Sequence, residues 1–219
     1  MGNRSENRKK RVSVVQDPQS ASRRDLLAGS VATIACALVP ASVIGIAQIP
    51  PGSGGFSVTE RQCLTAMVSR MIPSGPDGPG ALEAGCAQYI ESALGNAYQS
   101  LKKSYRSGLA ALDAYSISTW GKSFAALGTS EQDKILSDFE QSTKVGDYGD
   151  SAVFFGYVRQ HTLEGMFGDP SYGGNANFAG WDLIGYPGLR MYVPPEMQKM
   201  DAKIPRSRVS AEQLMHGSH

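Results

Sequence analysis

Histidine and cysteine, on which most metal and nucleophilic sites depend, are scarce in this sequence. Only three histidines and three cysteines occur among its 219 residues. No two cysteines stand in a Cys-x-x-Cys spacing, which leaves zinc ribbons, iron–sulfur clusters, thioredoxin-like redox motifs and covalently attached haem without support. His161 is the only histidine before the last four residues, so neither a nucleophile–base pair nor a three-ligand metal site is easily assembled.

Glycine motifs that hold nucleotides or expose a nucleophile are also missing. The sequence has no Gly-x-Gly-x-x-Gly run opening a strand–helix unit, as a Rossmann-type cofactor site requires, and no Gly-x-Ser-x-Gly run of the α/β-hydrolase kind. No segment alternates apolar and polar residues over a useful strand length. The lack of strand patterns predicts an all-α fold, and the apolar spacing and the length predict about six helices in one domain.

Charged residues of both signs are absent from residues 26–59. A basic stretch precedes this gap, an apolar stretch opens it, and a small-x-small site lies at residues 45–47. This is the order of a secretory signal, and the pair Arg23 and Arg24 with two leucines soon after it is typical of twin-arginine export. We therefore expect residues 1–47 to be a twin-arginine signal peptide.

Removal of the signal changes the charge of the chain. Seven Lys/Arg and three Asp/Glu lie in that segment, so 14 and 17 remain, a net charge of −3. The basic surplus of the whole sequence therefore belongs to the signal, and nothing in the remainder indicates binding to nucleic acid. A retained membrane anchor over residues 26–49 is the alternative to cleavage, because that stretch is long enough to cross a bilayer.

Two cysteines, Cys63 and Cys86, follow the signal. In an oxidising periplasm they could form a disulfide, which would stabilise the fold by about 3 kcal/mol in the chain-entropy description. Two separate buried thiols are the alternative, and the sequence leaves both open.

Helical segments separated by turn clusters make up residues 57–192, after a Gly/Pro-rich linker at 48–56. Ser57 and Glu60 have the spacing of a capping box, and Pro73 ends the helix that follows them. The apolar spacing predicts six helices, over residues 58–72, 81–94, 98–112, 117–127, 129–139 and 151–167.

Two long loops, 73–80 and 168–192, carry too many glycines and prolines for regular structure. Residues 193–219 are polar and broken by prolines, and such a segment cannot bury enough apolar surface to fold alone. We expect this extended tail to be disordered or to lie on another protein.

The segment from Glu164 to Gly188 combines seven glycines with several large aromatic side chains. A loop this long and this aromatic is ordered by packing, either on its own helices or on a partner. Rigid aromatics, short polar groups and few lysines are typical of protein interfaces. The candidate interface residues are Phe167, Asp169, Tyr172, Gly173, Gly174, Asn175, Trp181 and Tyr186.

His161 and Glu164 lie three residues apart on the last predicted helix, so both could face a metal ion. Asp169 or Asp182 would have to complete such a site, because catalytic metals usually take three protein ligands. The interpretation we favour is structural, with His161 hydrogen-bonded to the loop beyond the end of its helix.

Several runs in the sequence resemble the gluconate 2-dehydrogenase subunit 3 family. The runs are "GALEAGCAQYI", "SFAALGTSEQDKIL" and, most specifically, "EGMFGDPSYGGNANFAGWDLIGYPG", with "IPSGPDGPGA" as a weaker marker. The resemblance extends from about Phe56 to Pro187. Members of this family are small subunits of membrane-bound, flavin-dependent dehydrogenases of sugars and sugar acids.

The resemblance implies a role without chemistry in this chain. A large subunit of the glucose-methanol-choline (GMC) oxidoreductase type holds FAD and oxidises gluconate, 2-ketogluconate or a related sugar, and a multi-haem cytochrome c passes the electrons to ubiquinone. The small subunit has no catalytic residues, cofactor or metal of its own; it carries the twin-arginine signal and escorts the flavoprotein to the periplasm, where the complex is attached to the inner membrane. A helical periplasmic module with another partner, or a metal-dependent enzyme using His161 and Glu164, are the alternatives.

Overall fold

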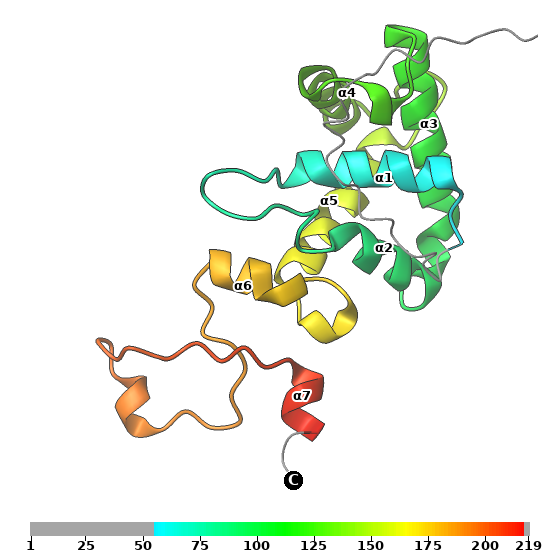
Figure 1. Ribbon diagram of the computed structural model, residues 1–219. Coiled ribbons are helices and arrows are strands. Elements are labelled where there is room, and N and C mark those ends of the chain that lie inside the picture. The colour runs from blue at the N-terminus through cyan, green and yellow to red at the C-terminus, as the bar shows by residue number, and fades with distance from the viewer. Residues whose placement is uncertain (1–54, 217–219) are drawn as a thin grey trace, which may run out of the picture. The chain divides into compact units, whose positions relative to one another are not determined.

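The computed structural model describes residues 55–216, which form α-helices joined by long loops (Figure 1). No strand occurs among these residues, so the all-α prediction is confirmed. The predicted signal, including Arg23 and Arg24, and nearly all of the predicted linker lie outside the described residues. The helices are α1 (Val58–Met71), α2 (Cys86–Gly95), α3 (Lys102–Trp120), α4 (Thr129–Gln141), α5 (Ser151–Phe167), α6 (Ala179–Leu183) and α7 (Ala211–His216).

Helix α1 begins as the sequence predicts. The Ser57 hydroxyl accepts a hydrogen bond from the Glu60 backbone N–H at 3.2 Å, and the Glu60 carboxylate accepts one from the Ser57 N–H at 2.6 Å. This reciprocal cap satisfies two backbone donors that the first turn would otherwise leave open. The helix ends at Met71, two residues before Pro73, as expected.

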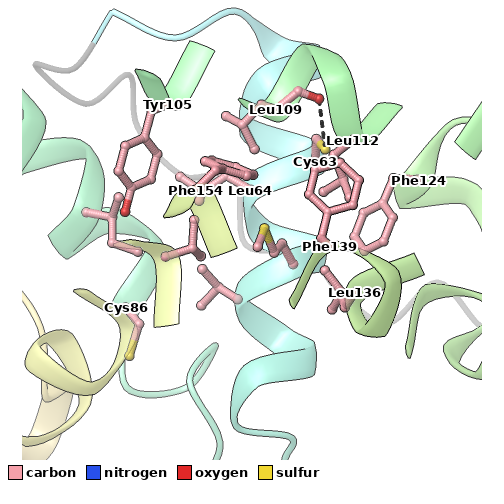
Figure 2. Close-up of a cluster of buried hydrophobic side chains, with 14 of the residues drawn as sticks. Cys63, Leu64, Cys86, Tyr105, Leu109, Leu112, Phe124, Leu136, Phe139 and Phe154 are labelled. Carbon is pink, nitrogen blue, oxygen red and sulfur yellow. Dashed lines mark hydrogen bonds between the residues drawn. The ribbon is translucent and has the colours of Figure 1, made fainter. Parts of the chain in front are cut away.

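Helix α5 is at the centre of the core and contacts α1, α2, α3 and α4. Apolar spacing predicts a stripe of Phe154, Phe155, Val158, Thr162 and Met166 on this helix; four of them are buried, and Phe155 is half-buried. Figure 2 shows Phe154 among the core side chains of α1 and α3. The approach of α3 depends on Gly108, because a Cβ there would lie 2.3 Å from the Phe154 ring.

The predicted helix over residues 117–127 is wrong. Ile117 and Trp120 instead belong to the end of α3, where both side chains are exposed, and α3 stops at Gly121 in the left-handed conformation (φ 70°). Phe124 follows in a separate 3₁₀ turn, and its side chain is buried. The Phe124 backbone N–H donates a hydrogen bond to the Asp113 carboxylate at 2.8 Å. Apolar spacing alone could not separate these two short pieces from one helix.

The C-terminal tail also differs from its prediction, because part of it folds back on its own chain. The guanidinium groups of Arg206 and Arg208 both contact the Asp182 carboxylate, and the Ser207 N–H donates to the Pro187 carbonyl at 2.6 Å. Ion pairs and backbone hydrogen bonds leave no apolar pattern, so this return of the tail could not be predicted from the sequence. Between residues 55 and 216, no helix combines the length and the apolar composition needed to cross a membrane.

Candidate partner-binding surface

The loop after α5 packs backbone against backbone on the end of that helix. A Cβ on Gly174 would lie 2.3 Å from the Gly165 carbonyl oxygen, and a Cβ on Gly180 would lie 1.8 Å from the Met166 carbonyl oxygen. Neither contact can be relieved by turning a side chain, because both involve main-chain atoms. Gly174 and Gly180 are therefore required for the loop to lie on α5.

The side chain of Asn175 holds the loop in shape. It is fully buried; its amide N–H donates to the Gly168 carbonyl at 2.9 Å, and its Oδ1 accepts from the backbone N–H groups of Gly180 at 2.9 Å and Trp181 at 3.4 Å. Those two N–H groups lie in the first turn of α6, so the Asn175 amide acts as the cap of that helix. The backbone of Asn175 is left-handed (φ 46°), and its own N–H donates to Gly165 O at 2.6 Å.

Two aspartates join the loop to the tail. Asp169 accepts hydrogen bonds from the Ser171 N–H and hydroxyl, at 2.9 and 2.6 Å, and from the Ala211 N–H at 2.9 Å. Partial burial alone would raise the pKa of Asp169, but these hydrogen bonds hold that pKa below its ordinary value. Asp182 binds both arginines of the returning tail. Each carboxylate thus has a structural use within the chain.

The outer side of the loop presents apolar side chains to solvent. Ile184 is 60% exposed and Tyr172 is 68% exposed, while Leu183 and Tyr186 are also on the surface. Ile184 and Tyr186 border a hollow of about 210 Å³, whose other lining residues are Phe167, Asp169, Trp181 and Leu189. We call Tyr172, Leu183, Ile184 and Tyr186 the exposed loop residues.

The earlier loop, 73–80, adjoins this segment. A Cβ on Gly78 would lie 2.7 Å from Leu183 Cδ1, and just after the earlier loop the Ala84 carbonyl accepts a hydrogen bond from the Ala176 N–H at 3.0 Å. The two Gly/Pro-rich loops that are far apart in the sequence therefore meet in the fold. Figure 1 shows the earlier loop, in cyan and green, next to α6.

The eight candidate interface residues divide into three groups. Tyr172, Gly173 and Tyr186 are exposed, Phe167 and Asp169 are half-buried, and Gly174, Asn175 and Trp181 are buried within the chain. The Trp181 indole N–H donates a hydrogen bond to the Phe167 carbonyl at 2.9 Å. The last three therefore build the loop and present no side chain to a partner in this conformation.

Sequence reasoning missed Leu183 and Ile184, whose side chains are exposed beside Tyr186. The available signal was their position next to Trp181: on a helical turn, a buried residue is followed by neighbours that face outward. The internal role of Asn175 also had a signal in the sequence. Asn in a glycine-rich loop tolerates the left-handed backbone conformation, and its side-chain amide can hydrogen-bond neighbouring backbone groups.

A cluster of polar and aromatic side chains lies behind the loop, on α2, α3, α5 and the segment between α2 and α3. The Glu164 carboxylate accepts hydrogen bonds from the hydroxyls of Tyr89 and Tyr98 and from the Gln160 amide, each at 3.0 Å. Burial alone would raise the pKa of Glu164, but these donors hold it below its ordinary value. Hydrogen bonding to Glu164 in turn raises the pKa of Tyr98.

His161 belongs to the same cluster and does not bind the loop, so that expectation is wrong. Its ring stacks on Tyr98 with centroids 4.3 Å apart, and its Nδ1 shares a 2.8 Å hydrogen bond with the Tyr105 hydroxyl. Among residues 55–216, no three His, Cys, Asp or Glu side chains come together in a group that could hold a metal ion. The structure places Asp169 and Asp182 in the tail contacts described above and does not bring them to His161 and Glu164.

Cys63 and Cys86 are separate buried thiols and do not form a disulfide. The Cys63 thiol lies 3.8 Å from the Leu109 carbonyl, and Figure 2 shows Cys86 on another side of the core. Burial raises the pKa of the Cys86 thiol to about 12 and that of Cys63 higher still. Both thiols are therefore protonated at neutral pH and poorly reactive.

The burial of His161 leads to a testable prediction about the stability of the protein in mild acid. Burial lowers the pKa of His161 below its ordinary value of 6.5, with Glu164 acting in the opposite direction. Because the unfolded chain binds this proton more readily than the folded one, the free energy of unfolding is expected to fall as the pH drops below about 6.5.

Urea unfolding of the wild type and of His161→Gln between pH 7.5 and 5.5 measures this effect. The lowered pKa of Glu164 acts below its ordinary 4.5, outside that range, so its contribution does not interfere. We expect His161→Gln to show a smaller loss of stability than the wild type over this interval. Parallel losses in the two proteins would contradict the role assigned to His161.

These observations define a helical domain built around an ordered, partly apolar loop. The family model of gluconate 2-dehydrogenase subunit 3 matches residues 59–188, from the first turn of α1 to the end of the loop. The chain belongs to this family, as the sequence resemblance indicated, and so has the role of a subunit in a multi-subunit dehydrogenase complex. Comparison with curated proteins and with solved structures gives no match.

Proposed function

We propose that this chain is the non-catalytic small subunit of a periplasm-facing, membrane-bound dehydrogenase that oxidises gluconate, 2-ketogluconate or a related sugar. In this proposal FAD is held by a GMC-type large subunit, and a multi-haem cytochrome c passes electrons to ubiquinone. The small subunit holds no cofactor and stabilises the flavoprotein. Its place is the periplasm, attached to the inner membrane through the complex.

The observation that carries the proposal is the loop from Glu164 to Gly188 inside the family match. Its shape is fixed by buried groups of the chain itself, Asn175 above all, while Ile184 and Tyr186 remain exposed. A preorganised loop loses little conformational entropy on binding, and exposed apolar side chains around a hollow favour a protein partner. The exposed loop residues are therefore our candidates for the contact with the flavoprotein.

The predicted export signal supports an escort role. FAD is loaded in the cytoplasm, so a flavoprotein must cross the membrane folded, and the twin-arginine pathway transports folded proteins. Arg23 and Arg24 would then serve both subunits, provided that the small subunit binds the flavoprotein before export. A firm interface is necessary for such co-transport.

Purification of the intact complex tests the proposal. The chain, tagged after His219, is co-expressed with the flavoprotein and cytochrome subunits and isolated from detergent-solubilised membranes. We expect flavin absorbance, haem bands and dye-linked oxidation of gluconate or 2-ketogluconate to elute together with the tag. A colourless preparation without dehydrogenase activity would overturn the proposal.

The escort role has a separate test in the twin-arginine pair. The double variant Arg23→Lys, Arg24→Lys is expected to leave the flavoprotein in the cytoplasm and to reduce periplasm-facing dehydrogenase activity at least tenfold. A control variant, Arg8→Lys with Lys9→Arg, keeps the charge of the basic stretch and should export normally. Normal export of the flavoprotein with the double variant would contradict the escort role.

A further inference from the structure

A groove of about 750 Å³ lies between the start of α1 and the α3 helix. Figure 1 shows the start of α1 beside α3. Helix α3 lines the groove with a stripe of mostly apolar side chains, and Ile117 at the end of this stripe is 52% exposed. The stripe consists of Arg106, Leu109, Ala110, Asp113, Ala114 and Ile117.

The charged groups of the groove already have partners within the chain. Arg106 forms an ion pair with Glu60 at 3.6 Å, and the Asp113 carboxylate accepts the Phe124 N–H at 2.8 Å. A charged occupant would have to compete with these contacts. The groove therefore favours an uncharged, apolar segment of chain.

The chain itself enters the groove at the Arg106 end. Gly55 and Phe56 both line the groove, and the Phe56 side chain is anchored in the core with 3% of its surface exposed. The Arg106 guanidinium donates a hydrogen bond to the Gly55 carbonyl at 2.6 Å. The residues that precede Gly55 therefore leave from a point inside the groove.

Those preceding residues, 48–54, have the composition that the groove favours. They read QIPPGSG, carry no charge, and include Ile49 and two prolines. Proline has no backbone N–H, so a segment with two prolines brings fewer donors that need partners when it is covered. Prolines also favour an extended chain, which is the form that lies along a groove.

The length of this segment matches the length of the stripe. Arg106 and Ile117 are eleven residues apart on α3, which corresponds to about 17 Å at 1.5 Å per residue. Ile49 precedes Gly55 by six residues, which corresponds to about 19 Å at 3.1 Å per residue in an extended, proline-rich chain. A segment held at Arg106 by Gly55 can therefore bring Ile49 to Ile117.

We propose that residues 48–54 lie in this groove, with Ile49 against Ile117. The inference goes beyond the proposed function and does not depend on it, because the occupant belongs to the same chain. The segment after the predicted signal is then held on the folded domain, and this face of α3 is closed to other proteins. Contact with the flavoprotein is left to the exposed loop residues.

Disulfide trapping in the full-length chain tests this placement, because a disulfide forms only where two Cα atoms come within about 7 Å. Ile49→Cys is combined with Ile117→Cys in a Cys36→Ser background, the tagged chain is oxidised in isolated membranes with copper phenanthroline, and peptide mapping identifies the bridges. The control pairs Ile49→Cys with Val153→Cys, since Val153 on α5 is as exposed as Ile117 but lies outside the groove.

We expect at least tenfold more bridging between positions 49 and 117 than between positions 49 and 153. Equal bridging in the two pairs, or none between positions 49 and 117, would overturn the inference.

A double-mutant cycle measures the same contact without a cross-link. Ile49→Ser is expected to lower the melting temperature of the purified full-length chain by about 3 °C, because the isoleucine returns to water. Combined with Ile117→Ser, it should cost clearly less than the sum of the two single losses, since both variants remove one contact. Val58→Ser is the control, because Val58 is 67% exposed and does not line the groove; its effect should add to that of Ile49→Ser. Additive losses in both pairs would contradict the contact.

A segment of the flavoprotein is the rival occupant of the groove. In the co-expressed complex we expect the Ile117→Ser chain to retain flavoprotein like the wild type. A tenfold loss of flavoprotein from the Ile117→Ser chain, with no bridge between positions 49 and 117 in the complex, would assign the groove to the flavoprotein. That result would overturn the inference and leave the proposed function intact.

Discussion

Replacement of Gly180 by alanine is expected to lift the loop from α5 and to destabilise the protein by about 3 kcal/mol, the upper range for overpacking. The added Cβ would lie 1.8 Å from the Met166 carbonyl oxygen and 3.1 Å from the Phe167 ring, and the first contact is with backbone that cannot turn away. Displacement of the loop would expose Trp181, which is buried. A Trp120→Phe background isolates the fluorescence of Trp181, which should shift to longer wavelength.

Gly156→Ala is the control for Gly180→Ala. Gly156 lies inside α5, where a Cβ would meet nothing within 4 Å. Alanine there should stabilise the helix by about 0.5–1 kcal/mol, because glycine is the weaker helix former. Wild-type stability and a buried Trp181 in Gly180→Ala would show that the loop does not lie on α5 as described. The placement of Ile184 and Tyr186 depends on the loop lying on α5. We therefore also expect the Gly180→Ala chain to retain less flavoprotein than the wild type.

Replacement of Asn175 by alanine is the second change with a large expected effect. It removes the amide that binds Gly168 O and the N–H groups of Gly180 and Trp181, and it leaves those buried backbone groups without partners. Each such loss costs about 1–3 kcal/mol, and alanine also tolerates the left-handed conformation poorly. We expect the free energy of unfolding, measured with urea, to fall by about 4 kcal/mol.

Asn177 provides the matched control, because it also has a positive φ, at 55°, but is exposed and makes no side-chain hydrogen bond that supports the loop. Asn177→Ala therefore measures the backbone cost alone, which should be about 1 kcal/mol. The difference between the two variants isolates the buried amide. Equal losses in both would show that the Asn175 side chain does not hold the loop.

The helices were predictable where a cap and a regular apolar stripe coincide. Ser57 and Glu60 mark the start of α1 in the sequence and in the structure, and four of the five residues of the predicted stripe on α5, all but Phe155, are buried. The prediction failed over residues 117–127, where Gly121 divides a run of apolar residues that periodicity alone treats as one helix. The five-residue helix α6 is likewise too short to produce a periodic signal.

The candidate site was predicted as a segment but not as a surface. Composition identified the loop from Glu164 to Gly188, because glycines and aromatics at that density do not suit a helix or a disordered linker. Which of its side chains face outward could not be predicted. Asn175 and Trp181 are residue types that are common at interfaces, yet both are buried within this chain. Leu183 and Ile184 are exposed instead.

The helical class, the family and the position of the loop could be predicted from the sequence, because local spacing and specific runs of residues are properties of the linear chain. The tertiary structure decided how the loop is held, that Cys63 and Cys86 stay apart, and that Asp182 draws the tail back to the loop. These features depend on contacts between residues distant in sequence. Such contacts are made by single carboxylates, amides and glycine backbones, which leave no periodic pattern to read.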